Sequence, residues 1–120
     1  MTSKINFNDL FVLELANNHW GNVDRGLKII RDFGAIVKHN NVKAAIKLQF
    51  RDVENFVHKD FRDHDSRYIQ KTLATKLSDS EYEILVDEIK NVGCIPMATP
   101  FDEASVDLCE KLNLPMIKIA

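Results

Sequence analysis

The order of apolar patterns along the chain is the feature that most constrains its fold. Four short apolar runs alternate with segments in which apolar residues recur every three or four positions. Short continuous runs are typical of buried strands, and the wider spacing is typical of amphipathic helices. Strands that alternate with helices are joined by right-handed crossovers and form a parallel sheet. The sequence therefore predicts an α/β fold built from parallel β/α units.

The elements expected from these patterns can be placed on the sequence. The expected strands are residues 11–16 (FVLELA), 44–50 (AAIKLQF), 94–99 (CIPMAT) and 116–120 (MIKIA). Helical spacing covers residues 24–37, 82–92 and 106–112. Ser78 and Glu81 predict a capping box at the start of the second helix. Pro96 weakens the third strand unless the backbone is unpaired at that point.

Residues 51–77 show no clean apolar period and are rich in charged and aromatic side chains. They predict a long loop with a short helix around Tyr68–Lys76. Loops of this length in compact domains are usually functional or mobile. We interpret His39, at a helix end, and His58 and His64, within the loop, as solvated side chains.

The length of the β/α units suits either a doubly wound sheet or a (β/α)₈ barrel. A barrel takes roughly 250 residues, so the 120 residues here would supply about half of one. The last expected strand also reaches the final residue of the sequence. We expect residues 1–120 to be the N-terminal portion of a single barrel domain, with about four strands, in a truncated chain.

Composition excludes several classes of function. The chain is 45% hydrophobic and 28% charged with a net charge of −2, and its charges of both signs are interspersed. This balance predicts no nucleic-acid partner and no polybasic membrane contact. No apolar run approaches the roughly 20 residues that span a bilayer, and the start lacks the pattern of a secretory signal. Cys94 and Cys109 have no metal-like spacing, so reduced buried thiols in a cytoplasmic protein are favoured over a disulfide or a zinc site.

Polar residues lie inside the expected strands, toward their C-terminal halves. Glu14, Lys47 and Lys118 each interrupt an apolar run, and the remaining strand ends in Thr99. A buried unpaired charge costs several kcal/mol, so these groups must be paired or must face a wet cavity. In parallel α/β folds that cavity lies at the carboxyl ends of the strands. Because Lys47 and Gln49 are two residues apart, they share one face, and the set predicts an anion site.

Two local alternatives remain open at this point. Glu14 and Lys47, on adjacent strands, could instead form a buried ion pair that only fixes the register of the sheet. Asn18 and His19, in the loop after the first strand, are well placed to hydrogen-bond a ligand. The same loop could also be a simple turn, because asparagine tolerates left-handed backbone conformations.

Five stretches of the chain together resemble a known family. They are ELANNHWG (14–21), AAIKLQF (44–50), LSDSEYEIL (77–85), ATPFDEASVDL (98–108) and LPMIKIA (114–120). In order and spacing they resemble the N-terminal barrel of the N-acetylneuraminate (sialic acid) synthase family. Ala16 stands where the family pattern has glycine, and Ala98 where it has serine. The resemblance implies a TIM barrel, of which these would be the first four strands.

The resemblance also implies an activity. Members of that family condense phosphoenolpyruvate with N-acetylmannosamine or a related amino sugar, and they release phosphate. They use a divalent metal, Mn²⁺ or Mg²⁺, whose ligands would lie beyond Ala120, so no metal ligand is expected within this chain. A cytoplasmic homodimer is expected for the full-length protein, with no membrane partner, and the fragment alone is expected to be inactive.

The same resemblance implies roles for individual residues. Lys47, Thr99 and Lys118 match positions that hold the phosphate and carboxylate of phosphoenolpyruvate, and Asn18 and His19 match the first-loop motif of the substrate site. The catalytic candidates are Glu14, which matches an acidic residue near the metal and the sugar, and Gln49, which matches a polar residue at the reacting centre. Residues 51–77 match poorly, which leaves the acceptor sugar open. Another barrel enzyme of phosphorylated or keto-acid substrates, such as an aldolase, and a non-catalytic barrel fragment remain alternatives.

Overall fold

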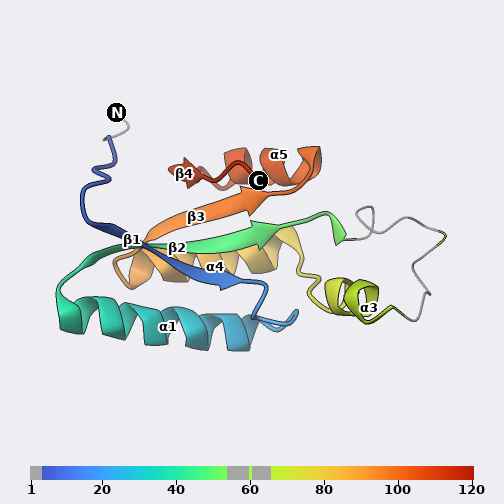
Figure 1. The fold of residues 1–120 in the computed structure, drawn as a ribbon, viewed down its shortest axis with the longest axis horizontal. Coiled ribbons are helices and arrows are strands. Elements are labelled where there is room, and N and C mark those ends of the chain that lie inside the picture. Colours follow the sequence, from blue (N-terminus) through green and yellow to red (C-terminus); the bar gives the residue numbers. More distant parts are fainter. Residues whose placement is uncertain (1–3, 54–59, 61–65) are drawn as a thin grey trace.

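A computed structural model of the chain describes residues 4–53, 60 and 66–120. It contains one four-stranded sheet, in which the strands lie in sequence order and every pair is parallel (Figure 1). The strands are β1 (Leu10–Ala16), β2 (Lys43–Phe50), β3 (Ile95–Pro100) and β4 (Met116–Ile117). The helices are α1 (Val23–Asn40), α3 (Arg67–Leu73), α4 (Asp79–Asn91) and α5 (Glu103–Lys111). The predicted class, parallel β/α units, is confirmed.

One face of the sheet packs against helices. On β2, Ile46, Leu48 and Phe50 are fully buried, and they join a core that includes side chains of α1, α4 and α5. The Phe50 ring lies 4.6 Å from the Tyr82 ring of α4, centroid to centroid. Side chains of a strand point alternately to its two faces, so the intervening residues lie on the other face. We call that second face, which carries Lys43, Ala45, Lys47 and Gln49, the inner face.

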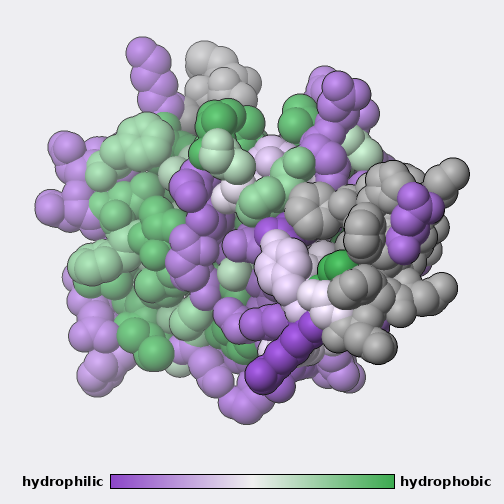
Figure 2. Space-filling view, turned by 45° about the vertical axis from the view of Figure 1, so that its right-hand side comes forward, coloured by the Kyte–Doolittle hydropathy of each residue, from purple (hydrophilic) through white to green (hydrophobic). Residues whose placement is uncertain are grey.

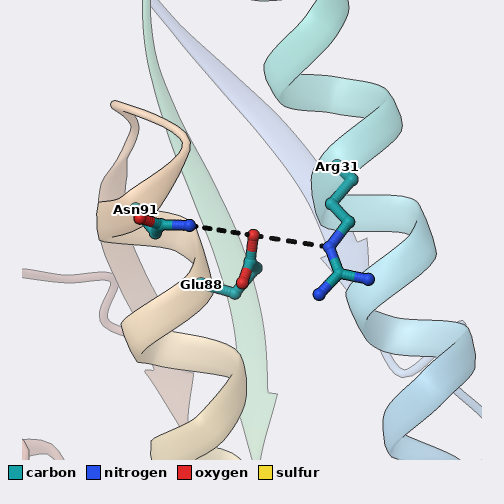
Figure 3. A network of polar contacts seen from close by, with 3 residues as sticks. All are labelled: Arg31, Glu88 and Asn91. Atoms are coloured by element: carbon teal, nitrogen blue, oxygen red, sulfur yellow. Dashed lines mark hydrogen bonds and ion pairs between the residues drawn. The ribbon is translucent and has the colours of Figure 1, made fainter.

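Helices α1 and α4 approach each other closely because α1 carries glycine at the contacts. A Cβ atom at Gly34 would lie 2.6 Å from the Cβ of Val92, and one at Gly26 would lie 2.8 Å from a Leu85 methyl group. A polar network lies on the solvent-exposed side of the contact between α1 and α4 (Figure 3). There Glu88 Oε1 lies 3.5 Å from Arg31 Nε and accepts a hydrogen bond from the Asn91 amide at 3.4 Å.

The predicted capping box of α4 is present. Ser78 Oγ accepts a hydrogen bond from the backbone N–H of Glu81 at 3.2 Å, and the Glu81 carboxylate accepts one from the backbone N–H of Ser78 at 3.0 Å. The hydrogen bond that the Ser78 backbone N–H donates to the carboxylate, together with the nearby Ser78 hydroxyl, holds the pKa of Glu81 below its ordinary value. The reciprocal pair satisfies two of the free N–H groups at the helix start.

Two prolines explain how β3 and β4 pair. Pro96 lies in β3 before the first residue pair with β4, so its missing N–H removes no hydrogen bond between these strands. The predicted strand 116–120 is wrong in length, since β4 ends at Ile117. The Lys118 N–H still donates to the Ala98 carbonyl at 2.9 Å. The next donor on β3 would be residue 100, which is a proline, so the ladder ends there.

The predicted loop 51–77 contains α3, close to the short helix expected at 68–76. His58 and His64 lie outside the described residues, whereas His39 is exposed near the end of α1. Cys94 and Cys109 are free and buried, and burial raises the pKa of both thiols. Within the described ranges no helix is both long enough and apolar enough to span a membrane.

Candidate active site

The register of the sheet brings the predicted polar residues to the inner face. Glu14 pairs with Lys47, and Lys47 pairs with Met97. Two residues further along β2 and β3, Gln49 pairs with Thr99. Paired residues of neighbouring strands point to the same face and lie about 4.8 Å apart, so these side chains form one cluster at the carboxyl ends of the strands. Figure 2 brings this end of the molecule forward and shows polar surface there, with apolar surface gathered to the left.

The Lys47 ammonium group is the best defined part of this cluster. Its Nζ lies 2.7 Å from Glu14 Oε1, and the exposed fractions of the two side chains are 5% and 55%. An ammonium group carries three N–H donors, and one partner accounts for one of them. The ion pair predicted as an alternative therefore exists and matches the register, but only its lysine is buried. Lys47 has no second partner within the described residues, which leaves two of its donors for a ligand.

The Thr99 hydroxyl is buried without a hydrogen-bond partner in the described part of the chain, and the residue is 2% exposed. A buried polar group without a partner costs about 1–3 kcal/mol. Such groups are rare, and a functional role is one of the explanations for them. The hydroxyl lies on the inner face beside Gln49, where a bound ligand could supply the missing partner.

Lys118 is exposed and lies two residues after Met116, which pairs with Met97. The two-residue period of an extended chain places Lys118 on the inner face. Lys47 and Lys118 therefore belong to the same side of the sheet.

The end of β1 carries a bulge that the sequence did not predict. Glu14 pairs with Lys47 but Ala16 pairs with Leu48, so one extra residue, Leu15, is inserted in β1. Ala16 has a φ of 52°, in the left-handed region that favours glycine. This backbone conformation explains why glycine suits that position of the motif.

The three residues after the bulge have different surroundings. Asn17 donates a hydrogen bond from Nδ2 to Gln49 Oε1 at 2.9 Å, and it was not among the residues predicted for the site. Asn18 is exposed and donates from Nδ2 to the Leu15 carbonyl at 2.9 Å. His19 is fully buried, with its ring 6.1 Å from the Tyr82 ring in an edge-on arrangement. Ligand contacts of Asn18 and His19 stay predictions.

The His19 ring is held neutral by its surroundings. Burial lowers the pKa of His19 from its ordinary 6.5 to about 4, against the opposing charge of Glu81. Its Nδ1 accepts a hydrogen bond from the Gly21 N–H at 3.0 Å, which places the proton of the neutral ring on Nε2. Nε2 has no partner among the described residues. The ring thus ties the loop after β1 to the core.

A separate hollow of about 260 Å³ lies at the same end of the sheet and is lined by residues that include Arg51, Lys76, Asp79 and Tyr82. Its lining does not include Lys47, Gln49 or Thr99. Since Tyr82 packs on Phe50, this hollow belongs to the helix side of the sheet, and it is not the predicted site.

The described residues contain no group of three or more His, Cys, Asp or Glu side chains that could hold a metal ion. The only acidic side chain predicted for the site, Glu14, is paired with Lys47. The part of the chain that the structure describes therefore does not by itself fit a divalent metal.

Parallel β/α units with cationic and polar side chains at the carboxyl ends of their strands define a class of α/β proteins that bind small ligands at that end. The NeuB family model matches residues 36–120. The chain belongs to the NeuB family.

Three known proteins show how far the likeness extends. An uncharacterized protein of Methanocaldococcus jannaschii is 30% identical over 109 residues, which are 91% of this chain and 29% of that protein. The crystal structure of a Chromobacterium violaceum protein named for spore coat polysaccharide biosynthesis is 38% identical with a TM-score of 0.87, covering 93% of this chain and 34% of that one.

The third is the N-acetylneuraminic acid (sialic acid) synthetase of Leptospira borgpetersenii serovar Hardjo-bovis, solved in complex with citrate. It is 21% identical with a TM-score of 0.72, covering 92% of this chain and 35% of that one. The chain thus spans about a third of the length of the proteins it matches. Its fold resembles the first half of the TIM barrel of a sialic acid synthase, as predicted.

Proposed function

We propose that the full-length protein condenses phosphoenolpyruvate with an N-acetylated amino sugar, giving a sialic-type acid and phosphate. Membership of the NeuB family supports this reaction class. The single structural observation that carries the proposal is the cluster of donors on the inner face. Among the described residues, Lys47 keeps free N–H groups and the Thr99 hydroxyl is buried without a partner.

The cluster suits a ligand with phosphate and carboxylate groups. Ammonium and hydroxyl groups donate to anionic oxygens, and such charge-assisted hydrogen bonds are the strong ones. Lys47 and Thr99 come from adjacent strands, and Lys118 continues the inner face from β4. In the proposal these three groups hold phosphoenolpyruvate, while Gln49 and Glu14 face the reacting carbons.

The proposed reaction forms one carbon–carbon bond and one carbon–oxygen bond, and it breaks the carbon–oxygen bond that joins phosphate to C2. C3 of phosphoenolpyruvate attacks the aldehyde carbon of the sugar, whose oxygen takes up a proton. Water adds to C2, and phosphate leaves with the oxygen that joined it to C2. The chain's own contribution is to bind and orient the two substrates at the inner face.

Two further assignments belong to the proposal. Because His19 is buried in the core and neutral, we assign it a structural role in holding the first loop. A Mn²⁺ or Mg²⁺ ion would need ligands from outside the described residues. The acceptor sugar is left as an N-acetylated amino sugar, and a cytoplasmic homodimer remains a prediction.

The proposal is tested by phosphate release from phosphoenolpyruvate by the full-length protein, with and without N-acetylmannosamine and related amino sugars. We expect release that depends on the sugar, and a product whose mass is that of the sugar plus pyruvic acid. In ¹⁸O-water the released phosphate should stay unlabelled, because the bond that breaks is between carbon and oxygen.

Three results would replace the proposal with another function. Labelled phosphate released without sugar indicates a phosphatase. A product formed from pyruvate without phosphoenolpyruvate indicates an aldolase. A folded, monodisperse 120-residue chain that promotes no phosphate release indicates a non-catalytic module, since this would show that nothing more is needed to complete the fold.

A further inference from the structure

The hydrogen bond from Asn17 to Gln49 connects the loop after β1 with the inner face. It joins Asn17 Nδ2 and Gln49 Oε1 over 2.9 Å, across 32 positions of sequence. We propose that Asn17 is a positioning residue that orients the Gln49 amide, so that its N–H groups point to the ligand. This inference rests on the proposed function, in which Gln49 lies at the reacting centre.

The bulge in β1 is what brings Asn17 to this place. Ala16 pairs with Leu48, so the next residue, Asn17, falls opposite Gln49. In a regular ladder without the bulge, Leu15 would lie opposite Leu48 and Ala16 opposite Gln49, and alanine could offer Gln49 no side-chain hydrogen bond. The left-handed conformation of Ala16, with a φ of 52°, holds the chain in this register.

The hydrogen bond from Asn17 determines which groups of the Gln49 amide remain for a ligand. A glutamine side chain has one carbonyl oxygen that accepts and one NH₂ group that donates. Asn17 occupies the oxygen with a donor, which leaves the two N–H bonds of Gln49 for another partner. Lys47, Gln49 and Thr99 then all present donors from one face. Such a set favours ligand groups that only accept hydrogen bonds, such as carboxylate and phosphate oxygens.

The test compares two replacements of Asn17 in the full-length protein: one removes the donor, and the other, of nearly the same size as asparagine, replaces it with an acceptor. Asn17→Ala removes the donor and should lower kcat/KM about five- to tenfold, the usual worth of one neutral hydrogen bond. Asn17→Asp replaces the donor with an acceptor, so the Gln49 amide should turn over and present its oxygen to the ligand. We expect Asn17→Asp to lower kcat/KM by at least about tenfold and more than Asn17→Ala does.

A double-mutant cycle separates positioning from a general effect on the fold. In a Gln49→Ala background, Asn17→Ala should have less than about a twofold further effect. Asn22→Ala, which removes the N-cap of α1 from the same loop, is the matched control. It should lower the free energy of unfolding and leave kcat/KM per folded molecule unchanged.

A second readout does not depend on activity. In a ¹H–¹⁵N spectrum, the side-chain amide pair of Gln49 is identified as the one missing from the Gln49→Ala protein. Asn17→Asp should move one of its protons downfield, because a carboxylate then accepts a hydrogen bond from it. An unmoved Gln49 amide overturns the inference, as does an equal effect of Asn17→Ala on kcat/KM in both backgrounds. A wild-type protein that releases no phosphate overturns only the proposed function, and the spectrum still decides the role of Asn17.

Discussion

The two faces of β2 have the same backbone and opposite chemistry. On the helix side, Ile46, Leu48 and Phe50 are fully buried in apolar surroundings. On the inner face, Lys47 forms an ion pair with Glu14, and Gln49 accepts a hydrogen bond from the loop after β1. The helix side of the strand supplies hydrophobic stabilisation, whereas the inner face holds groups that are costly to bury. Such costly groups are expected where a protein binds a ligand.

Local irregularities also separate the two faces. The Thr99 hydroxyl, buried without a partner among the described residues, lies on the inner face. The left-handed Ala16 and the bulge in β1 stand at the edge of the same cluster. We infer that the helix side determines stability and the inner face determines binding. Substitutions on the two faces should therefore have different effects.

The largest effect on stability is expected on the helix side. Phe50→Ala removes a ring that packs on Tyr82, and it should lower the free energy of unfolding by about 3–5 kcal/mol. The kcat/KM per folded molecule should stay within about twofold of wild type. Urea unfolding and active-site titration measure the two quantities. If Phe50→Ala does not fold, the milder Phe50→Leu takes its place. A loss of kcat/KM without any loss of stability would contradict the division between the faces.

The next effect concerns pH and the buried ring of His19. Between pH 6.5 and 4 the unfolded chain binds a proton at this ring while the folded chain, with its pKa near 4, does not. The contribution of this group to the free energy of unfolding is therefore fully present above pH 6.5 and falls as the pH is lowered to about 4. Below about pH 4 it falls no further, and the total loss is about 3 kcal/mol.

Urea unfolding from pH 7 to 5 measures the first part of this change. His19→Gln should remove the part of the slope due to the ring, whereas His39→Gln, at an exposed position, should keep it. An equal slope in wild type and His19→Gln would show that the ring does not carry the effect.

A smaller effect on the free energy of unfolding is expected from Thr99→Val, which tests the comparison on the inner face. Valine has nearly the shape of threonine but no hydroxyl, so a buried group without a partner disappears. The free energy of unfolding should stay the same or rise by about 1 kcal/mol, while affinity for phosphoenolpyruvate falls about tenfold. Chemical unfolding and calorimetric titration provide the two measurements. Lower stability with unchanged affinity would make Thr99 an ordinary core residue.

Periodicity and end signals predicted most of the fold. The alternation of Lys47 and Gln49 with Ile46, Leu48 and Phe50 identified the two faces of β2, because the two-residue period of a strand is independent of its partners. The capping box at Ser78 is a local pattern and was predicted for the same reason. The length of β4 was not predicted, because it depends on a proline at position 100 of the neighbouring strand.

The candidate site was predictable only in part. Lys47 and Gln49 were placed on one face by alternation, and Glu14 and Thr99 were grouped with them because they lie toward the carboxyl ends of their strands. Asn17 was missed because the bulge that sets it opposite Gln49 depends on how the two strands pair. The only sequence signal of the bulge is position 16, where the family pattern has glycine and this chain has alanine. The burial of His19 was not predicted, because burial of a loop side chain depends on the helices that pack over it.

The most direct test of the account is the affinity of the full-length protein for phosphoenolpyruvate, measured by calorimetry for two matched lysine variants. Lys43 and Lys47 lie on the same strand and the same face; Lys43 begins β2, and Lys47 lies four residues nearer its carboxyl end. We predict that Lys47→Met raises the Kd about 10- to 100-fold, since it removes a charged donor, and that Lys43→Met leaves the Kd unchanged. Equal Kd values for the two variants would contradict the claim that the inner face binds the ligand at the carboxyl ends of the strands.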